Sequence, residues 1–336
     1  MAKCSMQNQE SLPKLVGKFF FVFMLLTSTC LQKRKKMLDI NILKVSAQEF
    51  EFSKKRQQEL EKAGRFNDHE DEISYENCEP VDESFDYLKR GFRNRMKHWF
   101  YMRALKIYNK RINRQLTNLE VVGRENLAGV KGGRIITCNH ISKVDSFAVR
   151  AAIGPEFKFV AADFNNWKGI LGDLSRNTGY LPLPAKMNFS LMRKFNQSIE
   201  YFLQKKWPIL FYPEQALWCE YKKPRPLKRG AFFYAAKHHC PIIPTFITLQ
   251  EKPESVDAQG RANYCDYTIH ILPPIYPRAD LDERDNIEYM MDANFQAWRN
   301  CYEKTYGKPL VYDTELTKDT DAVVRKYVEM VNQPSK

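Results

Sequence analysis

The stretch RIITCNHISKVD, residues 134–145, decides both the fold and the candidate chemistry of this chain. Its first five residues are mostly apolar or β-branched and contain no proline or glycine, which predicts a short buried strand at 134–138. The next residues bring a histidine and an aspartate to the opening of a helix predicted over 142–153. A histidine at such a strand–helix junction lies where loops expose side chains to a substrate.

His140 and Asp145 are the two residues of this stretch that can carry chemistry. Asp145 can return to the imidazole and hold its Nδ1–H, which leaves Nε2 free to accept a proton. The spacing also allows a simpler interpretation. Ser142 and Asp145 have the separation of a capping box with Asp in place of Glu, so Asp145 would serve only the start of the helix. His140 would then be an ordinary loop residue, and spacing alone leaves both interpretations open.

Outward from this stretch, short apolar runs alternate with longer helical patterns. This alternation predicts an α/β domain with a mostly parallel central sheet flanked by helices, and with its active groups at the strand ends. The predicted strands are 119–122, 134–138, 157–161, 180–183, 209–212, 242–249 and 267–272, and the predicted helices are 142–153, 188–204, 230–239, 285–304 and 317–331.

The charge of the 336-residue chain is strongly basic, with 53 Lys and Arg against 40 Asp and Glu, or +13. Such an excess predicts an anionic partner, either a nucleic acid or a lipid surface. Ten of the basic residues lie in 89–116, which holds no acidic residue, so the excess is local. The eight cysteines are scattered without a C-x-x-C pair, which indicates a reducing, cytosolic-side environment and predicts no metal site.

The basic stretch 89–116 is predicted to be an amphipathic helix that precedes the sheet. Its apolar stripe comprises Tyr101, Leu105, Tyr108, Ile112 and Leu116, at three- and four-residue spacing. Aromatic residues beside Lys and Arg suit the headgroup boundary of an anionic membrane. The alternatives are a helix packed on its own domain and, less favoured because no recognised motif accompanies the charge, a nucleic-acid-binding surface.

The remaining segments give the domain organisation. Residues 1–36 form a short apolar and basic N-terminal segment, whose apolar run 19–31 is shorter than the roughly 20 residues that a membrane span needs. This run is interpreted as an interfacial or barely spanning anchor, with an unstructured start as the alternative. Residues 37–88 are interpreted as an acidic variable arm, with 66–88 as a solvated linker. The catalytic domain is predicted over 117–312, and a C-terminal helical tail over 313–336.

A second cluster follows the predicted strand 209–212. Pro213 ends this strand and Glu214 lies just beyond it. Five cations then lead into the N-terminus of the next helix, an arrangement that favours phosphate, although a solvated loop has the same composition. These cations are Lys222, Lys223, Arg225, Lys228 and Arg229.

Four blocks of the sequence, in their order, resemble the four motifs of the glycerolipid acyltransferases, and most closely the 1-acylglycerol-3-phosphate (lysophosphatidate) acyltransferases. The resemblance covers roughly residues 118–249. The blocks are His140-x4-Asp145, Gly179-Tyr180-Leu181-Pro182-Leu183, Tyr212-Pro213-Glu214 and Cys240-Pro241-Ile242-Ile243-Pro244.

The resemblance implies a role for each matching residue. His140 would be the general base that takes the proton of an acceptor hydroxyl, and Asp145 would orient it. The acceptor would then attack an acyl thioester directly, without an acyl-enzyme. The implied substrate-binding residues are Gly179, Lys186, Glu214, Lys228 and Arg229.

The chain departs from the family pattern in its third motif. The family commonly has Glu-Gly-Thr-Arg there, whereas this chain has Glu214-Gln215-Ala216-Leu217 and lacks the arginine expected to hold phosphate. Lysine is not an equivalent fork for phosphate, so one of the cations 222–228 is expected to replace that arginine, or the acceptor differs.

The resemblance as a whole implies a membrane-associated O-acyltransferase on the cytoplasmic face. It would move a fatty acyl group from acyl-CoA or acyl carrier protein to a lysophospholipid, without a bound cofactor or metal. Its partners would be anionic lipid, the acceptor and the thioester donor, and not nucleic acid. Two alternatives remain: an acyl-thioester or lipid hydrolase that uses the same pair, and a non-catalytic basic membrane-binding module.

Overall fold

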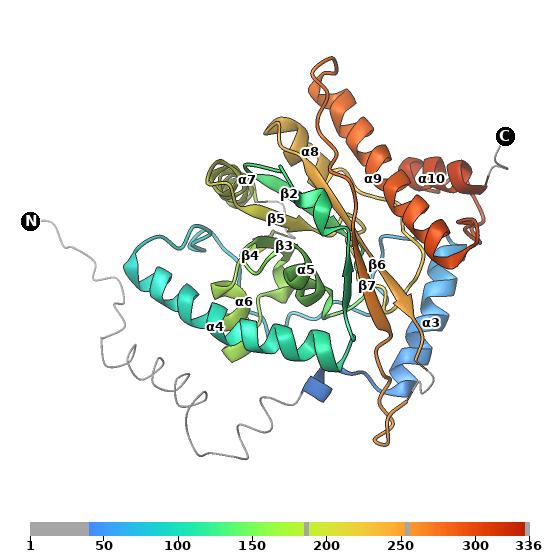
Figure 1. The fold of residues 1–336 in the computed structure, drawn as a ribbon, viewed down its shortest axis with the longest axis horizontal. Helices are drawn as coiled ribbons and strands as arrows, with labels where there is room; N and C mark the ends of the chain where they lie inside the picture. Colours follow the sequence, from blue (N-terminus) through green and yellow to red (C-terminus); the bar gives the residue numbers. More distant parts are fainter. Residues whose placement is uncertain (1–39, 185–187, 253–255, 333–336) are drawn as a thin grey trace, which may run out of the picture. The chain divides into compact units, whose positions relative to one another are not determined.

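The computed structural model describes residues 40–184, 188–252 and 256–332. Its centre is a seven-stranded sheet with the order β1-β7-β6-β2-β5-β3-β4 (Figure 1). Every neighbouring pair is parallel except β6 and β7, which are antiparallel. The strands are β1 (Glu120–Val122), β2 (Arg134–Cys138), β3 (Lys158–Ala162), β4 (Tyr180–Leu183), β5 (Pro208–Phe211), β6 (Ile242–Gln250) and β7 (Asp266–Ile271).

The predicted fold class, an α/β domain with a mostly parallel sheet, is confirmed. All seven predicted strands form, each within one residue of its predicted ends. The five predicted helices of the domain also form, as α5 (Asp145–Ile153), α7 (Phe189–Gln204), α8 (Gly230–Lys237), α9 (Glu283–Tyr306) and α10 (Ala322–Asn332). The alternation of apolar runs with helical patterns was therefore sufficient to place the sheet.

The helices cover both faces of the sheet. α5 and α6 (Gly169–Asn177) connect β2, β3 and β4 on one face, and α4 (Phe92–Gln115) packs on them from outside (Figure 1). α7 and α8 return the chain toward β5 and β6 on the opposite face, where α9 packs against α8 and β6. From β2 to β4 the chain moves toward one edge of the sheet, and after β4 it moves back through β5 to β6. Because crossovers between parallel strands are right-handed, this reversal puts the later helices on the opposite face.

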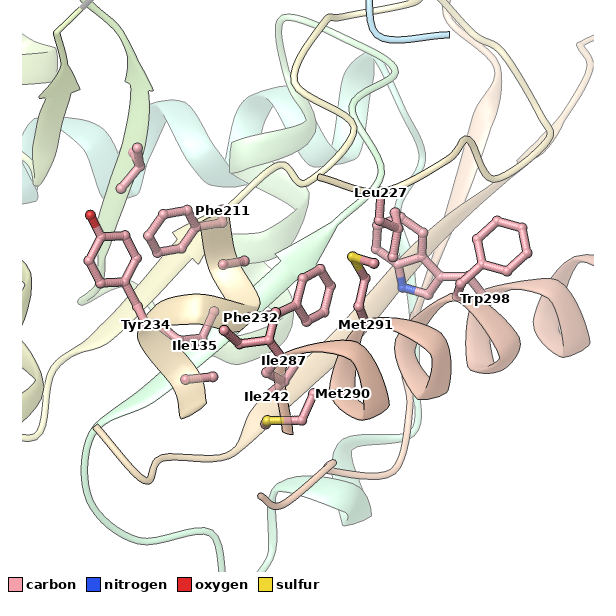
Figure 2. Close-up of a cluster of buried hydrophobic side chains, with 14 of the residues drawn as sticks. Ile135, Phe211, Leu227, Phe232, Tyr234, Ile242, Ile287, Met290, Met291 and Trp298 are labelled. Atoms are coloured by element: carbon pink, nitrogen blue, oxygen red, sulfur yellow. The ribbon is translucent and has the colours of Figure 1, made fainter. Parts of the chain in front are cut away.

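The largest part of the core lies between the sheet and the helices α8 and α9. Figure 2 shows that apolar side chains from three strands meet side chains from both helices there. Phe232, Phe295 and Trp298 are each fully buried in this cluster. Their packing holds β2, β5 and β6 in register, and thereby fixes the positions of the loops that follow these strands.

Two helices were not predicted. α3 (Ala47–Lys62) lies within the segment interpreted as an acidic arm and begins with a capping box, in which Ser46 and Glu49 exchange hydrogen bonds. Its buried residues are mainly polar, among them Gln57 and Glu61, so it lacks the apolar stripe from which a helix is predicted. The nine-residue α6 is short and leaves Leu171 exposed.

The basic helix α4 forms within the predicted range 89–116, but its predicted apolar stripe faces inward. Leu105 and Ile112 are buried against the domain. A second row, Phe92, Met96 and Trp99, lies exposed. Among the described residues, no helix combines the length and the apolar character that a transmembrane span requires.

The contacts divide the chain after Lys44. Before this point the described residues form only a 3₁₀ turn, Ile40–Leu43, and the apolar run predicted at 19–31 lies outside the described residues. The unit Val45–Lys336 contains the whole sheet and both motif loops.

Candidate active site

His140 and Asp145 meet at the carboxyl end of β2. The chain leaves the sheet after Cys138, turns through residues 139–144 and enters α5 at Asp145. His140 Nδ1 lies 2.7 Å from Asp145 Oδ2. The carboxylate is buried, whereas 22% of the histidine side chain is exposed. Because Asp145 occupies Nδ1, Nε2 is the ring nitrogen that can accept a proton from outside.

Asp145 does more than serve the start of the helix. The amides of Ile141 and Ser142 donate to Asp145 Oδ2 at 3.3 and 3.4 Å, and the bond from Ser142 is one half of a capping box. The other half is absent, because the hydroxyl of Ser142 accepts from the Val144 amide and not from the Asp145 amide. Since the same carboxylate also binds His140, the interpretation of Asp145 as a helix cap alone is wrong.

Tyr212, the first residue after β5, completes the surroundings of the pair. Its hydroxyl donates to Asp145 Oδ1 at 2.7 Å, so both carboxylate oxygens are bound. Its ring stacks on the imidazole of His140, with centroids 4.1 Å apart and planes inclined by 19°. Burial, and next the negative charge of Asp145, raise the pKa of Tyr212 well above its usual value. Tyr212 therefore remains a neutral donor.

The backbone of the histidine turn is fixed from two sides. The Asn139 side chain donates to the carbonyl of Ile247 in β6 at 3.0 Å and accepts from the amide of the same residue at 2.8 Å. On the other side, the amides of Trp218 and Glu220 donate to the carbonyls of His140 and Ile141. The turn is thus clamped between β6 and the loop that follows β5, and the direction of the imidazole is set before a substrate binds.

Glu214 lies beneath the turn rather than at its surface. Its side chain is 1% exposed, and Oε2 accepts from the His140 amide at 3.0 Å. The guanidinium of Arg225 donates to the same oxygen from Nη2 at 2.9 Å, and the Arg225 amide donates to Oε1 at 2.8 Å. Both carboxylate oxygens are thus used within the protein, which supports a positioning role for Glu214.

Arg225 is completely buried and cannot replace the missing phosphate-binding arginine as it stands. Besides its ion pair with Glu214, its guanidinium donates to the backbone carbonyls of Phe66, Ala216 and His140. It therefore connects the histidine turn, the loop after β5 and the segment that follows α3.

The other four cations of the loop are also paired with carboxylates of the chain. Lys223 binds Glu61, whose side chain is buried, and the remaining three pairs are more exposed. These are Lys222 with Glu251, Lys228 with Asp321 and Arg229 with Glu288. Lys228 lies next to the site, because its amide donates to the carbonyl of Pro213. Phosphate binding by Lys228 and Arg229 stays a prediction, because a phosphate would have to displace Asp321 and Glu288 from these two cations.

Gly179 lies directly before β4 with a φ of 120°. A Cβ atom at this position would come within 2.4 Å of the carbonyl oxygen of Phe157, so the backbone itself requires glycine here. Its implied contact with an acceptor stays a prediction. Lys186 lies outside the described residues.

The interpretation of residues 66–88 as a solvated linker holds for the middle of the segment, where residues 71–77 are exposed and no helix or strand forms, but not for its start. Phe66 is completely buried between Trp218 and Tyr312. Asn67 donates to the carbonyls of Glu214 and Pro226. The high acidic content concealed these anchors, which are single buried side chains and backbone groups rather than a periodic apolar pattern.

Residues 66–70, here called the strap, run along the loop after β5. The carbonyl of Asp68 accepts from Trp218 Nε1, and the carboxylate of Glu70 accepts from the Cys219 amide. Burial raises the pKa of Glu70, although the hydrogen bonds that its carboxylate accepts from Ser53, Gln57 and the Cys219 amide lower it. Between the two anchors lies His69, whose pKa is lowered first by burial and then by the nearby imidazole of His140 and guanidinium of Arg225. The strap thus forms part of the wall around the site.

Within the described part of the chain, no group of three or more His, Cys, Asp and Glu side chains is arranged to hold a metal ion. The cysteine nearest to the pair, Cys138, is fully buried, and burial raises the pKa of its thiol well above the usual value. The proton acceptor that the His140–Asp145 pair offers is the Nε2 of His140, whose side chain is 22% exposed.

Comparison with known proteins agrees with the motif order. Residues 118–248 match the Acyltransferase family model. A chloroplastic 1-acyl-sn-glycerol-3-phosphate acyltransferase of Brassica napus, BAT2, is 27% identical over 170 residues, which is 50% of this chain and 48% of that protein. The chain thus spans about half the length of the curated relative that it matches.

A solved structure, that of the 1-acyl-sn-glycerophosphate (LPA) acyltransferase PlsC from Thermotoga maritima, is similar with a TM-score of 0.48 and 16% identity. The match covers 65% of this chain and 85% of the other. The similarity to the family depends instead on the region that carries all four motif blocks and the His140–Asp145 pair. Residues 118–248 of this chain are similar to the Acyltransferase family, as the order of the motifs predicted.

Proposed function

We propose that the chain is a membrane-associated O-acyltransferase that transfers a fatty acyl group from a thioester donor to the hydroxyl of a lysophospholipid. The observation that carries the proposal is the hydrogen-bonded pair of His140 and Asp145, within a domain of the acyltransferase family. The donor is acyl-CoA or acyl carrier protein. The acceptor of first choice is 1-acylglycerol-3-phosphate, on which the Brassica napus relative acts by its name.

The chemistry of the proposed reaction uses His140 as a general base. Nε2 accepts the hydroxyl proton of the acceptor while the acceptor oxygen forms a bond to the thioester carbonyl carbon. The carbon–sulfur bond then breaks, and the leaving thiolate takes the proton back from the imidazolium. Asp145 stabilises the positive charge on the ring between these two steps, because it accepts the Nδ1–H bond throughout. No acyl-enzyme and no metal are required.

The proposed acceptor phosphate would bind beside the site through the exposed cations near Pro213. Lys228 is the first candidate because its backbone contacts Pro213, and its surface pair with Asp321 is 31% and 49% exposed. A doubly charged phosphate group can compete for such an exposed partner, since an exposed pair contributes about 1 kcal/mol or less. Arg229, paired with Glu288, is the second candidate.

The proposed membrane contact is the outer face of α4, on the cytoplasmic face of the membrane. Phe92, Met96, Trp99 and Ile107 are exposed there, along a helix that carries eight Lys and Arg residues and no acidic residue. Exposed aromatic side chains among basic residues suit the headgroup region of an anionic leaflet, where each Lys or Arg adds roughly 1 kcal/mol of binding.

The proposed activity is tested by thiol release from an acyl-CoA in the presence of lysophosphatidate. His140→Ala and Asp145→Asn should each lower the transfer rate about 10² to 10⁴-fold, the usual contribution of a positioned general base, with an unchanged circular dichroism spectrum. Retained activity in folded His140→Ala would refute the mechanism. Fatty acid release at the same rate without an acceptor would favour the hydrolase instead.

The proposed membrane contact is tested separately by flotation with phosphatidylglycerol-containing vesicles. Replacing Phe92, Met96 and Trp99 together by serine should reduce binding, while the same change at the exposed Phe189 of α7 should not. Equal binding by both variants would contradict the assignment of this face.

A further inference from the structure

Tyr212 contacts both members of the pair through different parts of one side chain. Its hydroxyl binds Asp145 Oδ1 at 2.7 Å, the oxygen that His140 does not use. Its ring covers one face of the imidazole at 4.1 Å. The family motif gave this residue no role, and no other described side chain touches both His140 and Asp145 in this way.

We propose that Tyr212 is a positioning residue for the general base, which fixes the plane of the Asp145 carboxylate and of the His140 ring. This inference rests on the proposed function. A carboxylate held at one oxygen by an imidazole can still rotate about its Cβ–Cγ bond. The bond from Tyr212 to the second oxygen removes this freedom, and the stacked ring keeps Nε2 directed toward the acceptor side.

The hydroxyl of Tyr212 also controls how strongly Asp145 holds a protonated imidazole. A donor on Oδ1 draws negative charge away from the carboxylate. Without it, Asp145 would bind the imidazolium more strongly, and His140 would keep its proton to higher pH. The other charged groups around His140 are Glu214 and Arg225 below its backbone and His69 from the strap, and a change at Tyr212 leaves all three in place.

The test is Tyr212→Phe, which keeps the stacked ring and removes only the hydroxyl. The expected result is a kcat about tenfold lower, the size of one hydrogen bond to a charged group, with an unchanged KM for lysophosphatidate. The acid limb of the pH–rate profile should move to higher pH, because the base loses its proton later.

Tyr327→Phe is the matched control. Tyr327 is completely buried, its hydroxyl donates to Asp292 at 3.3 Å, and its ring packs on Phe295 at 4.2 Å. It belongs to α10, and its hydroxyl and ring contact Asp292 and Phe295 of α9 rather than His140 or Asp145. Tyr327→Phe should therefore lose stability as Tyr212→Phe does, but keep the wild-type kcat and pH profile.

The proposal is overturned if Tyr212→Phe has the wild-type kcat and acid limb, if Tyr327→Phe shows the same changes, or if only the acceptor KM rises. A readout without substrate separates it from the proposed function. The ¹⁵N signals of the His140 ring, followed across pH in the free protein, should change at higher pH in Tyr212→Phe and at the wild-type pH in Tyr327→Phe. Failure of the wild type to transfer acyl groups would refute the proposed function, whereas unchanged ring signals in Tyr212→Phe would refute the positioning role.

Discussion

The buried pair of Glu214 and Arg225 separates two interpretations of the third motif. The resemblance implies that Glu214 binds the acceptor, whereas the structure has it 1% exposed beneath the histidine turn. If Glu214 binds the acceptor, its replacement should chiefly raise the acceptor KM. If it holds the turn in place, its replacement should chiefly destabilise the protein.

The expected magnitude follows from the contacts. Glu214→Gln removes the carboxylate that pairs with the Arg225 guanidinium, which is itself completely buried and also bound to three backbone carbonyls. Breaking a buried ion pair at one partner costs about 3–5 kcal/mol, because the remaining charge stays uncompensated. Arg225→Met should cost a similar amount, and the double variant should cost less than the sum of the two single variants.

Urea unfolding monitored by circular dichroism measures these free energies of unfolding. The control is the exposed pair of Arg229 and Glu288, for which Glu288→Gln should cost about 1 kcal/mol or less. The reasoning is refuted if Glu214→Gln unfolds at the same urea concentration as the wild type and only the KM for lysophosphatidate rises. In that case Glu214 is an acceptor ligand.

Further predictions concern single side chains around the site. Phe66→Ala should lower the free energy of unfolding by about 3–5 kcal/mol, since the ring is completely buried. Phe189→Ala, at an exposed position, should change it by about 0.5 kcal/mol or less, and urea titrations of both variants measure the difference. Gly179→Ala should lower the free energy of unfolding by about 3 kcal/mol, because the new Cβ would meet the Phe157 carbonyl. Gly129→Ala, where no atom lies within 4 Å of the new Cβ, should lower it only by the backbone strain of about 1–2 kcal/mol. Equal melting temperatures for the two variants would contradict the clash. Asn139→Ala should lower kcat more than tenfold with little change in KM, because the clamp on β6 is lost, and steady-state kinetics with unchanged kcat would show that the clamp is not needed.

The sheet could be predicted from the sequence because its central strands β2, β5 and β6 are nearly continuous apolar runs between turn signals. Such runs are typical of parallel strands that are buried on both faces. His140 and Asp145 were recognised as candidates because they follow a buried strand, but their spacing left a helix-capping role open, and their catalytic roles came from the resemblance to the acyltransferase motifs. Only the structure shows that the Ser142 hydroxyl bonds to the Val144 amide and that Asp145 binds the imidazole.

The strap and α3 could not be predicted in the same way. α3 is held by buried polar contacts, such as Gln57 to the Cys219 carbonyl, and not by a stripe of apolar residues. In the strap, the anchoring comes from a single ring, Phe66, and from hydrogen bonds with residues far away in the sequence, such as the bond that the Arg225 guanidinium donates to the Phe66 carbonyl. One local signal for α3 was present, the spacing of Ser46 and Glu49, which forms a capping box.

The roles of the five cations in the loop after β5 could not be predicted from the sequence either. Five cations in eight residues predicted phosphate binding, but each has a carboxylate partner, and four of these partners lie outside the loop. Pairing between distant segments leaves no pattern in a local window. Tyr212 was missed for a different reason, because an aromatic residue at a strand end is usually part of the core, and only the structure brings its hydroxyl to Asp145.

The most direct test of the central claim is thiol release from one acyl-CoA by the purified wild type and His140→Ala, with lysophosphatidate and a panel of other lysolipids. We expect acceptor-dependent release by the wild type, formation of the diacyl product with at least one lysolipid, and a loss of about 10² to 10⁴-fold in folded His140→Ala. Acceptor-dependent release at the wild-type rate by His140→Ala, or no release by the wild type with any lysolipid, would contradict it.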